Sequence, residues 1–254
     1  MVLDPANEGR LSPLASEGSP GLSTSKPPAR DRVPGEPVDD MVEQMITWTH
    51  QLTGTSEVVV AREQFFAAFG KVFPEDAFYD ARMAYFFDHF LFERPIAPAP
   101  GASSAMPSTP YETFAASARE SNDGAGAFVA ALGEARHSIY RVLKVSERTL
   151  VVADLVTPAK LVATARVGET FRGLEKKALF QGFLYPTPDG MRISHGLLIH
   201  PRRVARLIGR YLKRQKKSET FAKRTVLARL AHLQLKYLRH RHVDPKTFYE
   251  AELK

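Results

Sequence analysis

The sequence contains no cysteine, which excludes disulfide bonds, thiolate nucleophiles and zinc sites built on thiolate ligands. It has no run of about 20 apolar residues, the length that an α-helix needs to cross a bilayer. Its first residues also lack the basic start and the apolar run of a secretory signal. Together these absences favour a location in the cytoplasm.

Three motifs that mark local catalytic or nucleotide sites are missing as well. The chain has no Gly-x-Ser-x-Gly, no Walker loop and no Gly-x-Gly-x-x-Gly after a predicted strand. We therefore expect no bound cofactor and a protein without catalytic residues. An active site built from residues far apart in the sequence needs no local motif, so an enzyme of unknown class stays an alternative.

Acidic residues are scarce in one part of the chain. Residues 201–243 include 14 Lys or Arg and a single acid, Glu219, so this segment carries +13. Residues 1–200 carry −5 and residues 244–254 carry −1, so the net charge of +7 combines opposite contributions. An acidic body joined to a strongly basic segment is typical of a protein with an anionic partner.

Aromatic residues are absent from residues 1–37, which contain seven Pro, four Gly and five Ser. Such a segment cannot bury enough apolar surface to offset the entropy cost of ordering it, so we predict a disordered tail. The chain as a whole has 254 residues, of which 44% are hydrophobic and 25% charged, as is usual for a folded soluble protein.

Residues 38–135 have apolar side chains at helical spacing. The third predicted helix is apolar on nearly all sides, which is typical of a helix buried in a core. The predicted helices cover 38–54, 56–69, about 73–94, 111–120 and 123–135, with a Pro-rich loop at 95–110.

Residues 136–200 change to short runs rich in Val, Ile, Leu and Thr, which favour strands. Thr187-Pro188-Asp189-Gly190 is a good hairpin turn between the last two runs. Five short strands at this spacing predict a small antiparallel sheet or a partly open barrel. The predicted strands are Ser138–Val145, Leu150–Val156, Lys160–Val167, Ala178–Tyr185 and Met191–His200.

Residues 201–254 are predicted to form two basic amphipathic helices, at about 201–217 and 219–240, and a short helix capped by Asp244. Each longer helix has an apolar stripe with a basic face opposite. Lys and Arg gathered along a helix are what binding to an anionic surface requires. The candidate binding residues are Arg203, Arg206, Arg210, Lys213, Arg214, Lys216, Lys217, Arg229, Lys236 and Arg239.

This basic segment has more than one interpretation. We predict a non-enzymatic interaction or regulatory protein whose basic C-terminal helices meet an anionic partner, either an acidic protein or nucleic acid. Direct binding of nucleic acid is the alternative, although no helix-turn-helix, zinc-finger or RNP signature is present. A helix face that is only solvated would have the same pattern.

Histidines and carboxylates are the remaining candidates for chemistry. Asp88 and His89 are adjacent on the aromatic helix, where side chains point about 100° apart, so they cannot form an acid–base dyad unaided. We interpret them as helix-surface residues and Asp154 as a residue that caps a turn. We expect no metal site. His137, His195 and His200 lie at strand positions or ends, and Lys and Arg, which repel a cation, surround His232, His240 and His242.

Several segments together resemble a family of uncharacterised bacterial proteins. They are Phe86–Pro95, Ser138–Val142, Val152–Thr157 and Gly196–Pro201, and the resemblance covers about residues 40–215. Some members carry a SEC-C-type Cys/His zinc motif, which this cysteine-free chain lacks, so no zinc is implied. The resemblance implies a helix-rich start, a small β-unit and a terminal helix, and it implies no established activity.

These observations predict an α+β fold. A helical region at 38–135 comes first, followed by the β-unit at 136–200 and the basic helices of 201–254, which pack back onto the body.

Overall fold

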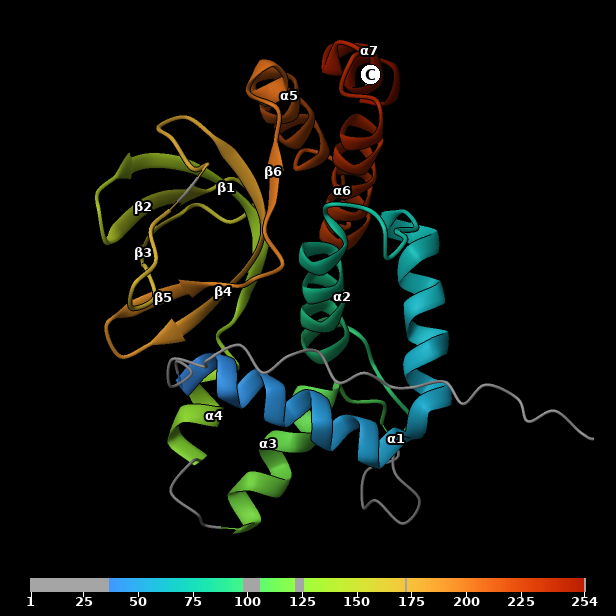
Figure 1. Cartoon of the computed structure of the whole chain (residues 1–254), viewed down its shortest axis with the longest axis vertical. Helices are drawn as coiled ribbons and strands as arrows, with labels where there is room; N and C mark the ends of the chain where they lie inside the picture. The colour runs from blue at the N-terminus through green and yellow to red at the C-terminus, as the bar shows by residue number, and fades with distance from the viewer. Residues whose placement is uncertain (1–36, 98–105, 122–125, 172, 254) are drawn as a thin grey trace, which may run out of the picture. The chain divides into compact units, whose positions relative to one another are not determined.

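The computed structural model describes residues 37–97, 106–121, 126–171 and 173–253 (Figure 1). Helices precede and follow a small β-barrel, so the predicted α+β class is confirmed. The predicted tail lies outside the described residues except for Pro37, as does the middle of the Pro-rich loop, at 98–105.

The N-terminal part contains α1 (Pro37–Phe69), α2 (Tyr79–Glu93), α3 (Pro110–Ser121) and α4 (Gly126–Leu132). The helix α1 covers the first two predicted helices, and its helical conformation is interrupted at Gly54, where the sequence predicts a stop.

The helix α2 begins later than predicted. The Asp76 side chain accepts a hydrogen bond of 2.9 Å from the backbone N–H of Phe73 and holds the chain there in a turn. The aromatic run itself is helical, and Tyr85, Phe86, Phe90 and Leu91 are buried, as its composition predicts.

The barrel consists of β1 (Arg136–Val145), β2 (Thr149–Asp154), β3 (Ala159–Thr164), β4 (Leu179–Thr187) and β5 (Gly190–Ile193). The strand order is β1-β2-β3-β5-β4, and pairing of β4 with β1 closes the ring. β6 (Leu198–His200) pairs with Leu179–Gln181 of β4, on the edge opposite β1. The pairs are antiparallel except β3 with β5, which are parallel, so the barrel is closed and mixed rather than antiparallel and partly open.

The strand predicted over Met191–His200 is two strands, β5 and β6. The break is a consequence of packing on α2. The Ser194 hydroxyl donates to Asp88 of α2 and accepts a 2.8 Å hydrogen bond from the Gly196 N–H. A Cβ at Gly196 would lie 2.5 Å from the Cα of Tyr85, so only glycine allows this approach.

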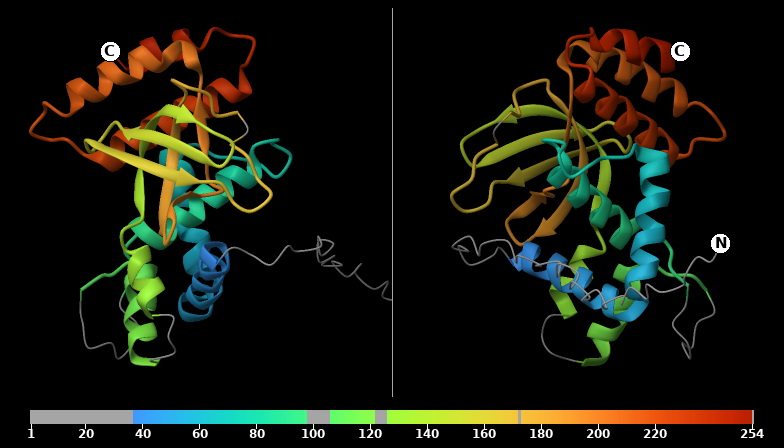
Figure 2. Two further views of the ribbon diagram at one scale, coloured as in Figure 1. Left: turned by 90° about the vertical axis from the view of Figure 1, so that its left-hand side faces the viewer. Right: turned by 45° about the vertical axis from the view of Figure 1, so that its right-hand side comes forward.

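The C-terminal part contains the 3₁₀ turn η1 (Arg202–Val204) and the helices α5 (Ala205–Gln215), α6 (Lys223–Arg239) and α7 (Pro245–Glu252). Asp244 caps α7 as predicted, because its side chain accepts from the Lys246 N–H. Figure 2 shows α5, α6 and α7 lying together beside the barrel.

Three apolar clusters hold these parts together. One fills the barrel and includes Tyr140, Phe180 and Leu184. A second joins α1, α2, α3 and α4 to the outer face of β4, and a third joins α5, α6 and α7 to β1 and β4. Every residue of β4 from Leu179 to Tyr185 is buried, because one face lines the barrel and the other is covered by helices.

Candidate functional site

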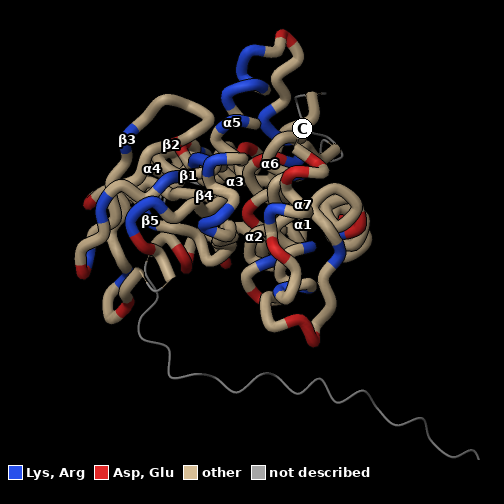
Figure 3. Tube along the Cα trace, turned by 90° about the horizontal axis from the view of Figure 1, so that it is seen from above, with Lys and Arg blue, Asp and Glu red and all other residues tan. Residues whose placement is uncertain are grey.

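The ten basic residues predicted to bind a partner divide between two places. Figure 3 shows Lys and Arg along α5 and the turn after it. Seven of the ten lie on η1, α5 and that turn, and three lie on α6. The first group is Arg203, Arg206, Arg210, Lys213, Arg214, Lys216 and Lys217; the second is Arg229, Lys236 and Arg239.

The three predicted binding residues on α6 already have partners inside the molecule. Arg229 lies 3.5 Å from a carboxylate oxygen of Glu252 on α7. Lys236 lies over the ring of Phe248 at 5.3 Å. Arg239 donates to the Lys71 carbonyl at 2.8 Å and to Asp76 at 2.9 Å. Each of these three cations therefore has a contact within the molecule.

The basic residues of α5 are mostly without partners. Arg206, Arg210 and Lys213 are exposed and lie at i, i+4 and i+7 on one face, opposite the buried Ile208 and Tyr211. Together with the exposed Lys216 and Lys217 they make no ion pair with any described residue. We call these five residues the α5 basic face.

Two other basic residues of this segment contact the residues that flank α7. Arg203 lies 3.7 Å from Asp244, and Arg214 donates to the backbone carbonyl of Leu253. Beside the face, α5 and α7 enclose a groove of about 310 Å³. Its lining combines apolar and charged groups: Leu207, Arg210, Tyr211, Arg214, Tyr249, Glu250 and Leu253.

A buried polar network lies where α2 meets the barrel. The His137 Nδ1 is 2.8 Å from Glu93, and the His137 Nε2 is 2.5 Å from the Tyr85 hydroxyl. Gln181 donates to the same hydroxyl at 2.5 Å. Burial raises the pKa of Glu93, but His137, His89 and Lys223 outweigh it and lower that pKa to about 2. The carboxylate is therefore ionised and anchors this network.

Asp88 and His89 are buried, at 3% and 2% exposed, so their interpretation as helix-surface residues is wrong. Asp88 accepts hydrogen bonds from the Tyr185 and Ser194 hydroxyls, and burial raises its pKa to about 6. His89 faces Glu93 at 3.7 Å, and burial lowers the pKa of His89 to about 3. The two neighbours thus belong to separate networks.

Asp88 and His195 line one cavity of about 340 Å³, together with Tyr185 and Ser194. The Ser194 hydroxyl donates to Asp88 and not to a histidine. This arrangement differs from a nucleophile activated by a base, in which a histidine accepts the proton of the serine. The cavity therefore lacks the geometry of a serine hydrolase.

The other predicted candidates for chemistry are dispersed. Asp154 accepts from the backbone N–H groups of Val156 and Thr157, at 2.8 and 3.1 Å, so its interpretation as a turn cap is confirmed. The His200 Nδ1 lies 2.9 Å from the Tyr249 hydroxyl, and burial lowers the pKa of His200 to about 3. Within the described residues, no group of three or more His, Asp and Glu has the arrangement of a metal site.

Sequence reasoning missed Arg82, Tyr85, Glu93 and Gln181. Of these, only Glu93 could have been found from local sequence, because it follows His89 by four residues and so lies on the same helix face. Arg82 is 1% exposed and donates to the carbonyls of Phe69 and Ala231. Its partners come from α1 and α6, which only the folded chain brings to α2.

In the part of the chain that the structure describes, no helix combines the length and the apolar character needed to cross a membrane. No family model, curated protein or solved structure matches this chain. The resemblance to a bacterial family therefore stays a prediction.

Proposed function

We propose that this is a non-enzymatic cytoplasmic interaction protein whose α5 basic face binds an acidic surface of another protein. The observation that carries this proposal is the set of five exposed cations, Arg206, Arg210, Lys213, Lys216 and Lys217, that make no ion pair with described residues. By contrast, Arg202, Arg203, Lys223, Arg229 and Arg239 each lie within 3.8 Å of a carboxylate of the same molecule. Unneutralised charge of one sign on a rigid helix favours an anionic partner.

The surroundings of the α5 basic face favour a protein over nucleic acid. Glu175 lies beside Arg202 and Asp244 beside Arg203, so neither of these paired cations adds unpaired positive charge to the α5 basic face. The adjoining groove offers Leu207 and Tyr211 to an apolar side chain. A charged rim around such an anchor point is typical of a protein–protein interface.

Reversing charges on α5 tests the proposal. The variant Arg206→Glu/Arg210→Glu/Lys213→Glu changes exposed residues without internal ion pairs, so the fold is retained. A matched control, Lys144→Glu/Arg148→Glu/Lys160→Glu, makes the same charge change on exposed positions of the barrel. Arg229, Lys236 and Arg239 are left intact because their reversal would break contacts within the molecule.

The measurement is crosslinking and affinity purification from cells, followed by binding titrations with each purified partner. We expect to recover a protein with an acidic surface, and we expect its complex with this protein to persist after nuclease treatment. The barrel control should bind this partner as the wild type does, whereas the α5 variant should bind it at least about tenfold more weakly. Equal binding by both variants would overturn the proposal. Loss of all partners on nuclease treatment would replace it with nucleic-acid binding.

A further inference from the structure

A second recess lies away from the α5 basic face, where the end of α1 meets α6 and α7. It has a volume of about 470 Å³, within the usual range for small-ligand sites. Ala68 and Phe69 come from α1, and Glu252 comes from α7. The remaining lining residues all lie on α6: Arg224, Thr225, Ala228, Arg229, His232 and Leu233.

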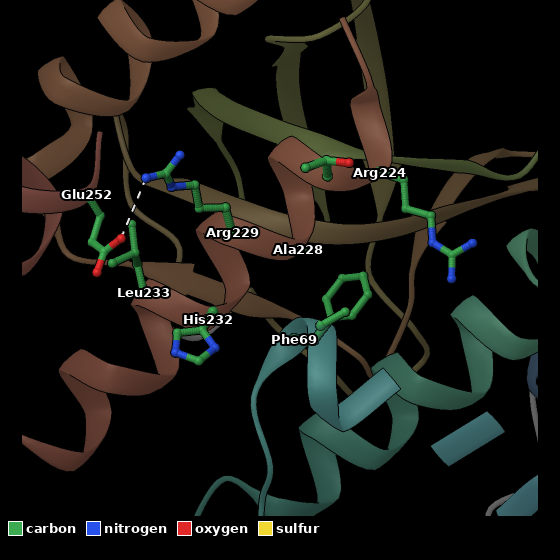
Figure 4. A pocket seen from close by; sticks show the side chains of 9 residues that line it. Phe69, Arg224, Ala228, Arg229, His232, Leu233 and Glu252 are labelled. Atoms are coloured by element: carbon green, nitrogen blue, oxygen red, sulfur yellow. Dashed lines mark ion pairs between the residues drawn. The ribbon is translucent and has the colours of Figure 1, made fainter. Parts of the chain in front are cut away.

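The recess has an apolar floor and a polar rim. Phe69 and Leu233 line it but are only 0% and 2% exposed, so the apolar surface open to a ligand comes from the exposed Ala68 and from Ala228, at 9% exposed. Figure 4 shows Arg229 and His232 on the side of Glu252, and Arg224 on the other side of Ala228. The rim thus holds two guanidinium groups and an imidazole against one carboxylate, which favours an anion.

The single carboxylate is weakly held. The Arg229 and Glu252 side chains are 47% and 45% exposed, and their closest atoms are 3.5 Å apart. A pair so exposed contributes little stability. A ligand carboxylate or phosphate can therefore replace Glu252 as the partner of Arg229, and the Glu252 carboxylate is then solvated by water. Arg224 makes no ion pair with a described residue, and it adds positive potential from the opposite side.

We infer that this recess binds a small amphipathic anion, a carboxylate or phosphate attached to an apolar group of several carbon atoms. The anionic group lies at Arg229 and His232, and the apolar group covers Ala68 and Ala228. This site is independent of the α5 basic face. No described lining residue of the recess belongs to that face.

Isothermal titration of the full chain with octanoate, phenyl phosphate, inorganic phosphate and octylamine tests the inference. We expect octanoate or phenyl phosphate to bind, with inorganic phosphate at least about tenfold weaker because it leaves the apolar floor empty. Octylamine is expected not to bind. Absence of binding by both amphipathic anions, or equal binding of inorganic phosphate, would overturn the inference.

Two opposite substitutions locate the site. Arg229→Gln removes the charged donor and is expected to weaken binding about tenfold. Glu252→Gln removes the internal competitor and is expected to tighten binding several-fold. The controls Arg206→Gln and Glu219→Gln make the same charge changes at exposed positions elsewhere and should leave binding unchanged. If the controls weaken and tighten binding in the same way, the effect comes from net charge, and the assignment of the ligand to this recess is contradicted.

The exposed Thr225 provides a third variant that leaves both ionic partners in place. Thr225→Phe fills part of the recess and should reduce octanoate binding about tenfold through loss of space. Unchanged octanoate binding by this variant would place the ligand elsewhere.

Discussion

At the scale of single residues, Arg82 shows how polar groups hold the interior of this protein together. Its guanidinium is 1% exposed, donates to two backbone carbonyls and contacts the side chain of Gln234. Burial lowers the pKa of Arg82 to about 10, so the group stays charged at neutral pH. It links α2 to α1 and α6 through hydrogen bonds that a shorter or apolar side chain cannot make.

Replacement of Arg82 by Met should therefore be costly, because it leaves buried acceptors without a donor. We expect Arg82→Met to lower the free energy of unfolding by about 3 kcal/mol, measured by urea denaturation. Arg206→Met, at an exposed position without an ion pair in the described structure, should change it by less than about 0.5 kcal/mol. Similar small losses in both variants would contradict this role of Arg82.

Asp88 makes stability depend on pH. Burial raises its pKa from 3.8 to about 6, although Ser194, Tyr185, His195 and Arg166 oppose the shift. Between these values the folded state binds more protons than the unfolded state, so the free energy of unfolding falls as pH rises through this window. The Asp88 contribution falls by about 2 kcal/mol between pH 4 and pH 7.

The variant Asp88→Asn isolates this dependence, because an amide does not titrate. We expect the stability of the wild type relative to Asp88→Asn to decrease by about 2 kcal/mol from pH 4 to pH 7, measured from urea unfolding curves. Asp80→Asn, at an exposed position on the same helix, is the matched control. A constant difference between wild type and Asp88→Asn would contradict the raised pKa.

Residues such as Asp88 and His89 mark the limit of prediction from the sequence. Their neighbours in the chain are aromatic, and a polar residue beside an apolar stripe is usually at the helix surface. Here the helix is enclosed on all sides, so these polar groups are buried and need partners. The partners of Asp88, Tyr185 and Ser194, come from β4 and from the segment after β5, and no local pattern predicts them.

At the scale of elements, the bend in α1 depends on Gly54. This residue has φ +75° and ψ 168°, a conformation available essentially only to glycine. A Cβ at this position would meet nothing within 4 Å, so the cost of a side chain comes from the backbone alone. The sequence predicted a break here because glycine is common where helices end.

Gly54→Ala should thus destabilise the protein by about 1–3 kcal/mol, although alanine favours helix. Gly126→Ala is the matched control: Gly126 begins α4, has no positive φ, and would also have open space around its Cβ. We expect this control to be neutral or stabilising by up to about 1 kcal/mol. Thermal unfolding of both variants is the measurement, and equal effects of the two substitutions would contradict the backbone argument.

The predicted strands agree with the structure where local pattern determines them. Alternating burial in β2 follows the alternation of its side chains, and the Thr187–Gly190 turn joins β4 to β5 as expected. The failures have tertiary causes. The strand over 191–200 is interrupted because Gly196 packs on α2, and ring closure depends on the long-range pair β1 with β4.

At the scale of the whole molecule, the +13 of residues 201–243 has two different uses. On α6, Arg239 pairs with Asp76 and joins the helix to the N-terminal part, while Lys236 over the Phe248 ring and Arg229 beside Glu252 contact α7. On α5 they remain available to a partner. Charge counted along the sequence does not separate these uses, because the pairing carboxylates are distant in the chain or lie on α7.

The shared packing of β4 predicts how the described part of the chain unfolds. Phe183 and Tyr185 pack with the N-terminal helices, Leu179 packs with the C-terminal helices, and Gln181 bonds to the Leu227 carbonyl at 2.9 Å. The barrel therefore cannot keep β4 buried once either group of helices is lost. We expect the helical region and the barrel to unfold in one cooperative transition.

Trp48, the only Trp, lies on α1 and packs against Phe114 of α3 with ring centroids 5.3 Å apart, so its fluorescence reports on the N-terminal helices alone. Pulse-labelled hydrogen exchange of peptides from Leu179–Thr187 reports on β4. Both signals should have the same urea midpoint, because the regions that they report on unfold in the same cooperative transition. Loss of the Trp48 signal while β4 stays protected would show that 38–135 and 136–200 fold as separate units, and would contradict the shared core.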